Sequence, residues 1–272
     1  MTDQAATIRE HYSTEGLTER IQSALDSIAP DGQTLSVNDL APLDQFHVRG
    51  MLATAELARA AGVGPSTAVL DVGCGIGGPA RSLAATFGCK VTGIDQSPSF
   101  IDAANYLTLR SGLSSLVSFQ RGDALHLPSG DSTFDVVLLQ HVAMNIQDRA
   151  ALYDEVARVL KPQGRFATYD LVFRRGEVAY PVPWARHAST SFLLSERETR
   201  TALEEAGFTP IVWRDDTEAA LEWFRVTMAG SPQNGLNLGV VMGQEMRQMT
   251  SNLASNLRED RLGVLFAVLR RD

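Results

Sequence analysis

The chain has 272 residues, which is enough to bury a full core, and we expect one domain with an inserted cap. Its formal net charge of −8, without any run of Lys and Arg, excludes nucleic acid from the expected partners. Two cysteines are too few for a disulfide framework or a structural zinc site, and no apolar stretch approaches membrane-spanning length. We therefore expect a soluble cytoplasmic protein with no metal and no membrane partner.

The first part of the chain predicts helices. Residues 1–42 are polar and mixed, and apolar residues at spacings of three or four predict a helix at 17–28. We expect this segment to form an N-terminal helical arm or lid, in which Tyr12 either folds over a ligand or packs as a surface residue. A long Ala-rich helix is predicted from residue 43 to residue 61, with a Gly-Val-Gly-Pro stop after it.

From residue 68 onward, apolar runs and helical patterns alternate. The predicted strands lie at 68–72, 90–94, 117–121, 134–139 and 165–169, and the predicted helices follow residue 78 and lie at 99–111 and 149–160. Repeated strand–helix units predict a mostly parallel α/β sheet with helices on both faces. Ligands bind such sheets at the carboxyl ends of the strands.

The alternation stops after the fifth strand. Residues 174–195 are irregular and rich in Pro and aromatic residues, which predicts a cap. A helix at 195–206, a strand at 209–214, a Met-rich helical region and a strand at 263–269 follow, and the two late strands predict an antiparallel edge. We expect an arm at 1–42 and a ligand-binding domain at 43–272, in which residues 174–260 contribute the cap and the substrate pocket.

A glycine-rich turn follows the first strand. Residues 68–78 place Asp71 at the strand end and four glycines within the next seven residues. The spacing satisfies both the G-x-G-x-x-G pattern of dinucleotide sites and a D-x-G-x-G-x-G pattern. A carboxylate at Asp71 would repel a pyrophosphate and attract the ammonium group of an amino acid. The turn therefore favours S-adenosylmethionine (SAM) over a nicotinamide or flavin dinucleotide.

Acidic residues also end the next two strands. Asp95 lies 24 residues after Asp71, where its two carboxylate oxygens can accept hydrogen bonds from ribose hydroxyls. This feature is shared by dinucleotide and SAM folds. Asp123, with Ala124 after it, follows the third strand and supplies an acceptor suited to an adenine amino group.

Five ordered segments resemble the successive motifs of class I SAM-dependent methyltransferases, namely residues 69–78, 93–95, 122–124, 134–137 and 160–165. The resemblance covers about residues 43–171 and is nearest to enzymes that act on quinones, sterols, sugars and glycine or sarcosine. It implies a Rossmann-like seven-stranded sheet, with Gly73 and Gly75 at the methionine part of SAM, Asp95 at the ribose, and Asp123 with Ala124 at the adenine. The remaining residues that we assign to the cofactor are Asp71, Gln96, Gln140 and Gln45.

The segment after the fourth strand carries the catalytic candidates. Residues 140–149 resemble a Q-D-x-x-x-H-x-x-D-R pattern, but His141 stands at the Asp position and Asn145 at the His position. His141 titrates near neutral pH and is our first choice of general base, with a buried structural histidine as the alternative. Asp170 ends the fifth strand and resembles an acid that positions acceptor hydroxyls in sugar-modifying relatives. Segment 45–50, which contains His47, resembles one near the methionine carboxylate.

Methyl transfer needs an in-line nucleophile, and positioning with exclusion of water can supply much of its rate. We expect O-, N- or C-methylation of a hydrophobic small molecule, such as a natural product or a quinone. Aromatic residues after Phe173 are candidates for its pocket: Tyr180, Trp184, Phe192, Trp213, Trp223 and Phe224. The alternatives are a glycine- or sarcosine-type amine as acceptor, an NAD-dependent oxidoreductase, and a catalytically silent SAM-binding protein. Whether the chain forms a homodimer is left open.

Overall fold

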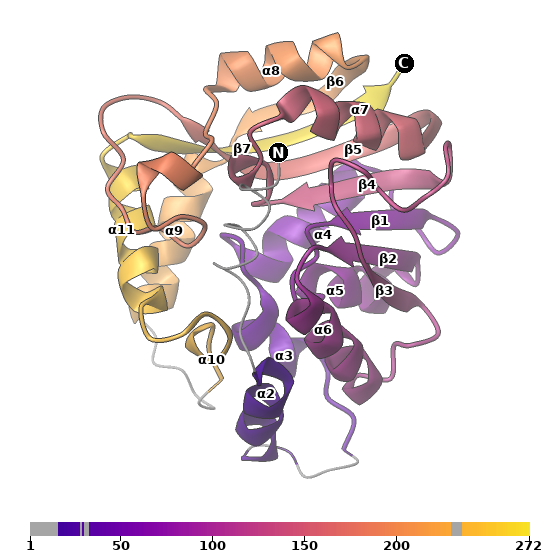
Figure 1. The fold of residues 1–272 in the computed structure, drawn as a ribbon, viewed down its shortest axis with the longest axis vertical. Coiled ribbons are helices and arrows are strands. Elements are labelled where there is room, and N and C mark those ends of the chain that lie inside the picture. The colour runs from indigo at the N-terminus through magenta and orange to yellow at the C-terminus, as the bar shows by residue number, and fades with distance from the viewer. Residues whose placement is uncertain (1–15, 28, 30–32, 230–235) are drawn as a thin grey trace.

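The computed structural model describes residues 16–27, 29, 33–229 and 236–272, and seven strands in this part of the chain form one sheet (Figure 1). The strands are β1 (Ala68–Val72), β2 (Lys90–Asp95), β3 (Val117–Arg121), β4 (Phe134–Gln140), β5 (Leu160–Phe173), β6 (Phe208–Asp215) and β7 (Leu262–Arg271). Their order is β3-β2-β1-β4-β5-β7-β6, and β7 runs antiparallel to both of its neighbours. The predicted mostly parallel sheet and its late antiparallel pair are confirmed.

Helices pack on both faces of this sheet, as predicted. The helices of the described residues are α2 (Leu17–Asp26), α3 (Val37–Asp44), α4 (Gly50–Ala60), α5 (Gly78–Phe87), α6 (Pro98–Arg110), α7 (Arg149–Val159), α8 (Glu196–Glu205), α9 (Thr217–Ala229), α10 (Gly239–Met242) and α11 (Met246–Arg258), with short 3₁₀ turns η1 (Ala143–Asn145) and η2 (Ala188–Thr190). The Met-rich region thus divides into α9, α10 and α11.

Alternation along the strands divides the core into two faces. Val69, Val136 and Leu138 pack with α4, α5, α9 and α11. Leu70, Val137 and Leu139 point the other way and pack with α7 and α8. A third apolar cluster joins α2, α3, α6 and α10, and Figure 1 shows α10 close to α2. The central strands are therefore buried on both faces, whereas the edge strands β3 and β6 are partly exposed.

The predicted continuous helix from 43 to 61 is wrong, because the chain breaks between α3 and α4. α3 ends at Asp44, α4 begins at Gly50, and Arg49 between them has a left-handed φ of 64°. The break brings residues 44–46 against the glycine turn, so close that a Cβ on Gly78 would lie 2.1 Å from the Asp44 carbonyl oxygen. A helix running through these residues could not make that contact. The Ala-rich spacing belongs to α4 alone.

The N-terminal arm contributes helix α2 in its described part, while Tyr12 lies outside the described residues. Leu17, Ile21 and Leu25 are buried, and the Arg20 guanidinium donates to the Val240 carbonyl at 3.2 Å and thereby ties α2 to α10. The assignment of residues 1–42 as a lid stays a prediction. The predicted turn at 161–164 is wrong, because these residues lie inside β5, where the register with β4 shifts.

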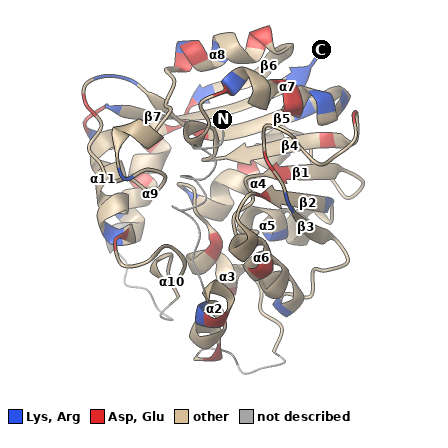
Figure 2. Cartoon of the chain, viewed as in Figure 1, with Lys and Arg blue, Asp and Glu red and all other residues tan. Residues whose placement is uncertain are grey.

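Charged residues are spread over the outer elements. In Figure 2, segments with Lys or Arg alternate with segments with Asp or Glu on α2 and α7. Within the described ranges, every helix is too short or too polar to cross a lipid bilayer. The same residues contain no group of three or more His, Cys, Asp or Glu side chains that could hold a metal ion.

Candidate functional site

A cavity opens at the carboxyl ends of β1, β2 and β4 and beside the loop after β3. It contains about 980 Å³ of empty space, part of which is open to solvent. The strand ends form its floor, and its other walls come from the break before α4, from α6, from the segment after β5 and from α10 and α11. The residues of those other walls are Phe46, Phe100, Pro183, Trp184, Met242 and Met246.

Gly73 and Gly75 line this cavity with their backbone, as expected. Gly73 has a φ of 72°, and a Cβ there would lie 2.4 Å from Val142, so no side chain fits between the turn and the loop after β4. The Gly73 N–H donates to the Ile94 carbonyl at 2.8 Å. The turn is therefore fastened to β2 and leaves its open side for a ligand.

Asp71 is buried behind the glycine turn and does not line the cavity. Its Oδ2 atom has no hydrogen-bond partner in the described part of the chain. Burial, and secondly the charge of Asp95, raise the pKa of Asp71 to about 7. Because a nearby cation would reverse that shift, Asp71 suits a ligand that brings positive charge to the turn.

Arg81 is a fully buried cation that braces the same turn. Its guanidinium donates to Asp44 Oδ2 and to the Ile76 carbonyl, each at 2.8 Å, and to Thr108 Oγ1 at 3.2 Å. These bonds join the turn to α3 and α6. Sequence reasoning missed this role, although an Arg within the otherwise apolar start of α5 was a usable signal.

Asp95 lines the cavity at the end of β2. Its Oδ2 accepts from the Gly75 N–H at 3.0 Å and its Oδ1 from the Ser97 N–H at 2.9 Å, which leaves lone pairs on both oxygens for ligand hydroxyls. Burial raises the pKa of Asp95 to about 6, against the effect of these backbone bonds. Asp95 can therefore accept hydrogen bonds from ribose hydroxyls at the position expected for the ribose.

The loop after β3 presents backbone rather than a carboxylate to the cavity. Gly122 and Ala124 line it, whereas Asp123 does not. Asp123 Oδ1 instead accepts from the Leu125 N–H at 3.0 Å and from Gln96 Nε2 at 3.2 Å. Asp123 thus holds the Gln96 side chain, and Gln96 is the residue that reaches the cavity.

His141 lines the cavity directly after β4 and has a φ of 54°. Successive strand residues point to opposite faces, so this left-handed conformation is what lets Gln140 and His141 both face the cavity. The imidazole stacks on Tyr169 at a centroid distance of 5.8 Å, with ring planes 8° apart. The expectation that His141 titrates near neutral pH is wrong, because burial, and secondly His47, lower the pKa of His141 well below its usual value and keep the ring neutral.

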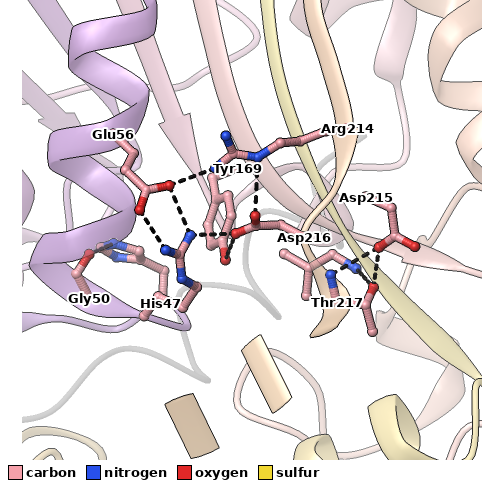
Figure 3. A network of polar contacts seen from close by, with 10 residues as sticks. His47, Gly50, Glu56, Tyr169, Arg214, Asp215, Asp216 and Thr217 are labelled. Atoms are coloured by element: carbon pink, nitrogen blue, oxygen red, sulfur yellow. Dashed lines mark hydrogen bonds and ion pairs between the residues drawn. The ribbon is translucent and has the colours of Figure 1, made fainter. Parts of the chain in front are cut away.

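A polar network holds Tyr169 under this ring, and Figure 3 shows its members converging from α4, β5, β6 and the start of α9. Tyr169 donates its hydroxyl to Asp216 Oδ2 at 2.9 Å, and Arg49 donates to the same oxygen at 2.6 Å. Glu56 pairs with both Arg49 and Arg214 at 2.6 Å. Because these partners are far apart in sequence, sequence reasoning did not find the network.

Asp170 and Gln45 lie behind the walls and do not line the cavity. The Asp170 carboxylate accepts from the Ala143 and Leu171 N–H groups, both at 2.8 Å, and so fixes η1 next to His141. The hydrogen bonds of Asp170 therefore give this residue a structural role. Gln45 Nε2 donates to Asp44 at 2.9 Å, and its Oε1 is buried without a partner in the described residues.

The expected site residues thus divide into two groups. Those that line the cavity are Gly73, Gly75, Asp95, Gln96, Ala124, Gln140 and His141, and those that lie behind its walls are Asp71, Asp123, Asp170 and Gln45. Of the aromatic residues expected in the pocket, Trp184 lines it, whereas Tyr180, Trp223 and Phe224 belong to the apolar core. Trp213 instead donates to Glu196 at 2.7 Å on the outer side of β6.

Comparison with known proteins finds similarity over part of the chain. Residues 70–168 match the family model described as a methyltransferase domain. The sterol 24-C-methyltransferase of Eremothecium gossypii is 32% identical over 179 residues, which cover 62% of this chain and 48% of that protein. The chain therefore spans about half the length of the curated relatives it matches.

Two solved structures share the fold at low identity. Geranyl diphosphate C-methyltransferase from Streptomyces coelicolor A3(2) has a TM-score of 0.71 at 18% identity and covers 100% of this chain and 99% of its own. The [4+2]-cyclase SpnF has a TM-score of 0.64 at 20% identity and covers 88% of this chain and 98% of its own. Because the identities are only 18% and 20%, this likeness shows the fold alone.

Proposed function

We propose that the protein transfers a methyl group from SAM to a hydrophobic small molecule, as the match of residues 70–168 to a methyltransferase domain suggests. One observation carries the proposal. A single cavity runs from the ends of β1, β2 and β3, where nucleoside-binding groups lie, to a wall of apolar side chains and His141 beyond β4. Cofactor and acceptor can therefore meet in it.

The residues along the strand ends fit SAM part by part. Gly122 and Ala124 line the part of the cavity proposed for adenine, Asp95 has lone pairs for two ribose hydroxyls, and the turn at residues 73–75 leaves backbone room for the amino-acid tail. The unpartnered Oδ2 of Asp71 suits the positive charge of that tail. When bound, SAM supplies an electrophilic methyl group on a sulfonium.

The acceptor side of the cavity is apolar. Met144, Pro183, Trp184, Met242 and Met246 line it, and none of the described lining residues is a Lys or an Arg. An acceptor with a carboxylate or phosphate would be buried there without a partner cation. The lining therefore supports a neutral hydrophobic acceptor, such as a natural-product aglycone or a quinone, over a glycine- or sarcosine-type amine.

A direct test incubates the purified full chain with methyl-labelled SAM and a panel of acceptors: a hydroxylated quinone, a polyketide aglycone, a sterol and sarcosine. We expect label in one or more of the three hydrophobic acceptors. Label in sarcosine alone would favour the amine alternative. SAM binding without any transfer over a broadened panel would favour a catalytically silent SAM-binding protein.

His141 is the proposed general base in this reaction. Its neutral imidazole lines the cavity and can take the proton of an acceptor hydroxyl, while the stack on Tyr169 fixes the ring plane. We predict that His141→Ala lowers kcat by about 10²–10⁴ and leaves the Kd of SAM within about threefold, because general-base catalysis contributes about that much. The exposed His126 provides the control variant His126→Ala, which should change neither quantity. Equal losses in kcat and affinity would instead assign His141 a structural role.

The raised carboxyl pKa values predict that SAM binding releases protons. In the free protein the pKa is about 7 at Asp71 and about 6 at Asp95, and a bound cation favours the ionised form of both. Affinity should therefore rise as pH increases from about 5.5 to 8, with the largest proton release near these pKa values. Calorimetry at pH 6.5 in buffers of different ionisation enthalpy measures the release, which Asp71→Asn should reduce. An affinity that does not change over this range would contradict the account.

We also propose a cytoplasmic location, because both cysteines, Cys74 and Cys89, are buried free thiols, as suits a reducing compartment. Cell fractionation tests the location. Sedimentation velocity of the purified chain tests whether a second copy is a partner.

A further inference from the structure

Gln140 ends β4 with a buried carboxamide that lines the cavity and is only 8% exposed. Its Oε1 accepts from Thr54 Oγ1 at 3.1 Å. Its Nε2 has no hydrogen-bond partner in the described part of the chain. A buried amide that is satisfied at one end and open at the other indicates a ligand contact at the open end.

A hydrogen-bonded chain behind Gln140 determines which end is open. His47 Nε2 lies 2.9 Å from the Gly50 carbonyl oxygen and 3.0 Å from Thr54 Oγ1. The carbonyl can only accept, so Nε2 carries the hydrogen of the neutral ring. A protonated Nε2 has no lone pair for the Thr54 hydroxyl, so the Thr54 oxygen can only share this N–H with the Gly50 carbonyl, and its own hydrogen is left for Gln140 Oε1. The chain therefore turns the amide with its NH₂ toward the cavity.

His47 can serve this purpose because it stays neutral. Burial lowers its pKa to about 4, and among the packed elements the groups that face it are the neutral rings of His141 and Tyr169. It does not line the cavity itself. The buried hydrogen bonds of His47 therefore orient Thr54 and, through it, Gln140.

The position of β4 in the sheet indicates which ligand group Gln140 meets. β4 lies next to β1, and Leu139 pairs with Val72 immediately before the glycine turn. With the nucleoside over β2 and β3, the amino-acid tail of SAM lies over β1 and extends toward β4. A carboxamide NH₂ can only donate, whereas the ammonium of the tail has no lone pair and the sulfonium sulfur is positively charged and a poor acceptor. The tail carboxylate is the group that remains.

We propose that His47 and Thr54 are positioning residues, which orient the Gln140 carboxamide so that its NH₂ binds the carboxylate of the SAM amino-acid tail. The inference rests on the proposed function, since it takes SAM as the ligand. His47 and Thr54 would thus contribute to cofactor binding through Gln140, although no side chain of α4 lines the cavity.

The test compares two ligands that differ in the tail. S-adenosylhomocysteine carries the carboxylate, and 5′-methylthioadenosine keeps the nucleoside and thioether without it. In Thr54→Val, which removes the hydroxyl and keeps the shape, we expect the affinity for S-adenosylhomocysteine to fall about fivefold to tenfold, as for one lost hydrogen bond, with methylthioadenosine binding unchanged. Thr54→Ser retains the hydroxyl and should bind both ligands like the wild type.

Gln140→Glu is a second, independent variant, because it keeps the acceptor for Thr54 and replaces the donor by a carboxylate oxygen. It should lower the affinity for S-adenosylhomocysteine at least as much as Thr54→Val does and leave methylthioadenosine binding unchanged. Unchanged affinity for S-adenosylhomocysteine in both variants, or equal losses for the two ligands, overturns the inference. A wild-type protein that binds neither ligand overturns the proposed function, and the inference with it.

Discussion

Replacing Arg81 by methionine is expected to lower the free energy of unfolding by about 3–5 kcal/mol, because the change leaves a buried carboxylate without its partner. Arg81 is 0% exposed and donates to Asp44 Oδ2, and burial raises the pKa of that carboxyl while Arg81 opposes the rise. The same substitution removes the donor to the Ile76 carbonyl in the glycine turn. Chemical denaturation of the ligand-free protein measures the loss.

Two control variants separate the causes. Asp44→Asn combined with Arg81→Met removes the unpaired charge as well, so the double variant should be more stable than Arg81→Met alone. Arg200 lies on the exposed side of α8 and pairs with Glu204 at 2.9 Å, and Arg200→Met should change stability by no more than about 0.5 kcal/mol. If Arg81→Met costs as little as Arg200→Met, Arg81 does not brace the turn.

Replacing Asp95 by alanine is expected to weaken SAM binding by about 1–3 kcal/mol, because hydrogen bonds to a charged acceptor are lost. Asp95 lines the cavity, and each of its oxygens makes one backbone hydrogen bond and has a lone pair left for the ligand. Isothermal titration with SAM measures the change.

Part of that loss comes from the glycine turn, since the Gly75 N–H also loses its acceptor. Asp95→Asn keeps one acceptor oxygen and should lose less affinity than Asp95→Ala. The exposed Asp154 on α7 provides a control of equal charge change, and Asp154→Ala should bind SAM like the wild type. Affinity that is unchanged in Asp95→Ala would refute the assignment of the ribose to β2.

Features that depend on neighbouring residues were predictable from the sequence. β1 and β3 have the predicted bounds, because a short apolar run between turn signals is a local pattern. The glycine turn at 73–78 is local as well, and so is the edge of the sheet where the cavity opens. Strand-end residues could therefore be assigned to the site as a group.

The orientation of those strand-end residues was not predictable in the same way. Asp71, Asp123 and Asp170 lie behind the walls of the cavity. Alternation along a strand turns Asp71 and Asp170 away from it, and Asp170 does not end its strand as expected, because β5 continues to Phe173. Asp123 lies in the loop after β3. His141 faces it through a left-handed φ that no propensity indicates. The position of a residue near a strand end thus predicts at which edge of the sheet it lies, but not whether its side chain points into the cavity.

Long-range pairs were beyond sequence reasoning for another reason. Asp44 and Arg81 are 37 residues apart, and Tyr169 and Asp216 are 47 apart, so their contacts depend on the final packing of several elements. The break between α3 and α4 has the same origin, since it is stabilised by contact with the glycine turn. Periodicity within one segment contains no information on such contacts.

The measurement that tests the central proposal most directly is calorimetric titration of the purified chain with SAM, S-adenosylhomocysteine and NADH. The arrangement of the glycine turn, Asp71 and Asp95 predicts that the first two bind with micromolar Kd and that NADH does not. Binding of NADH without either sulfur nucleoside would contradict the account from the glycine turn onward and would favour an oxidoreductase.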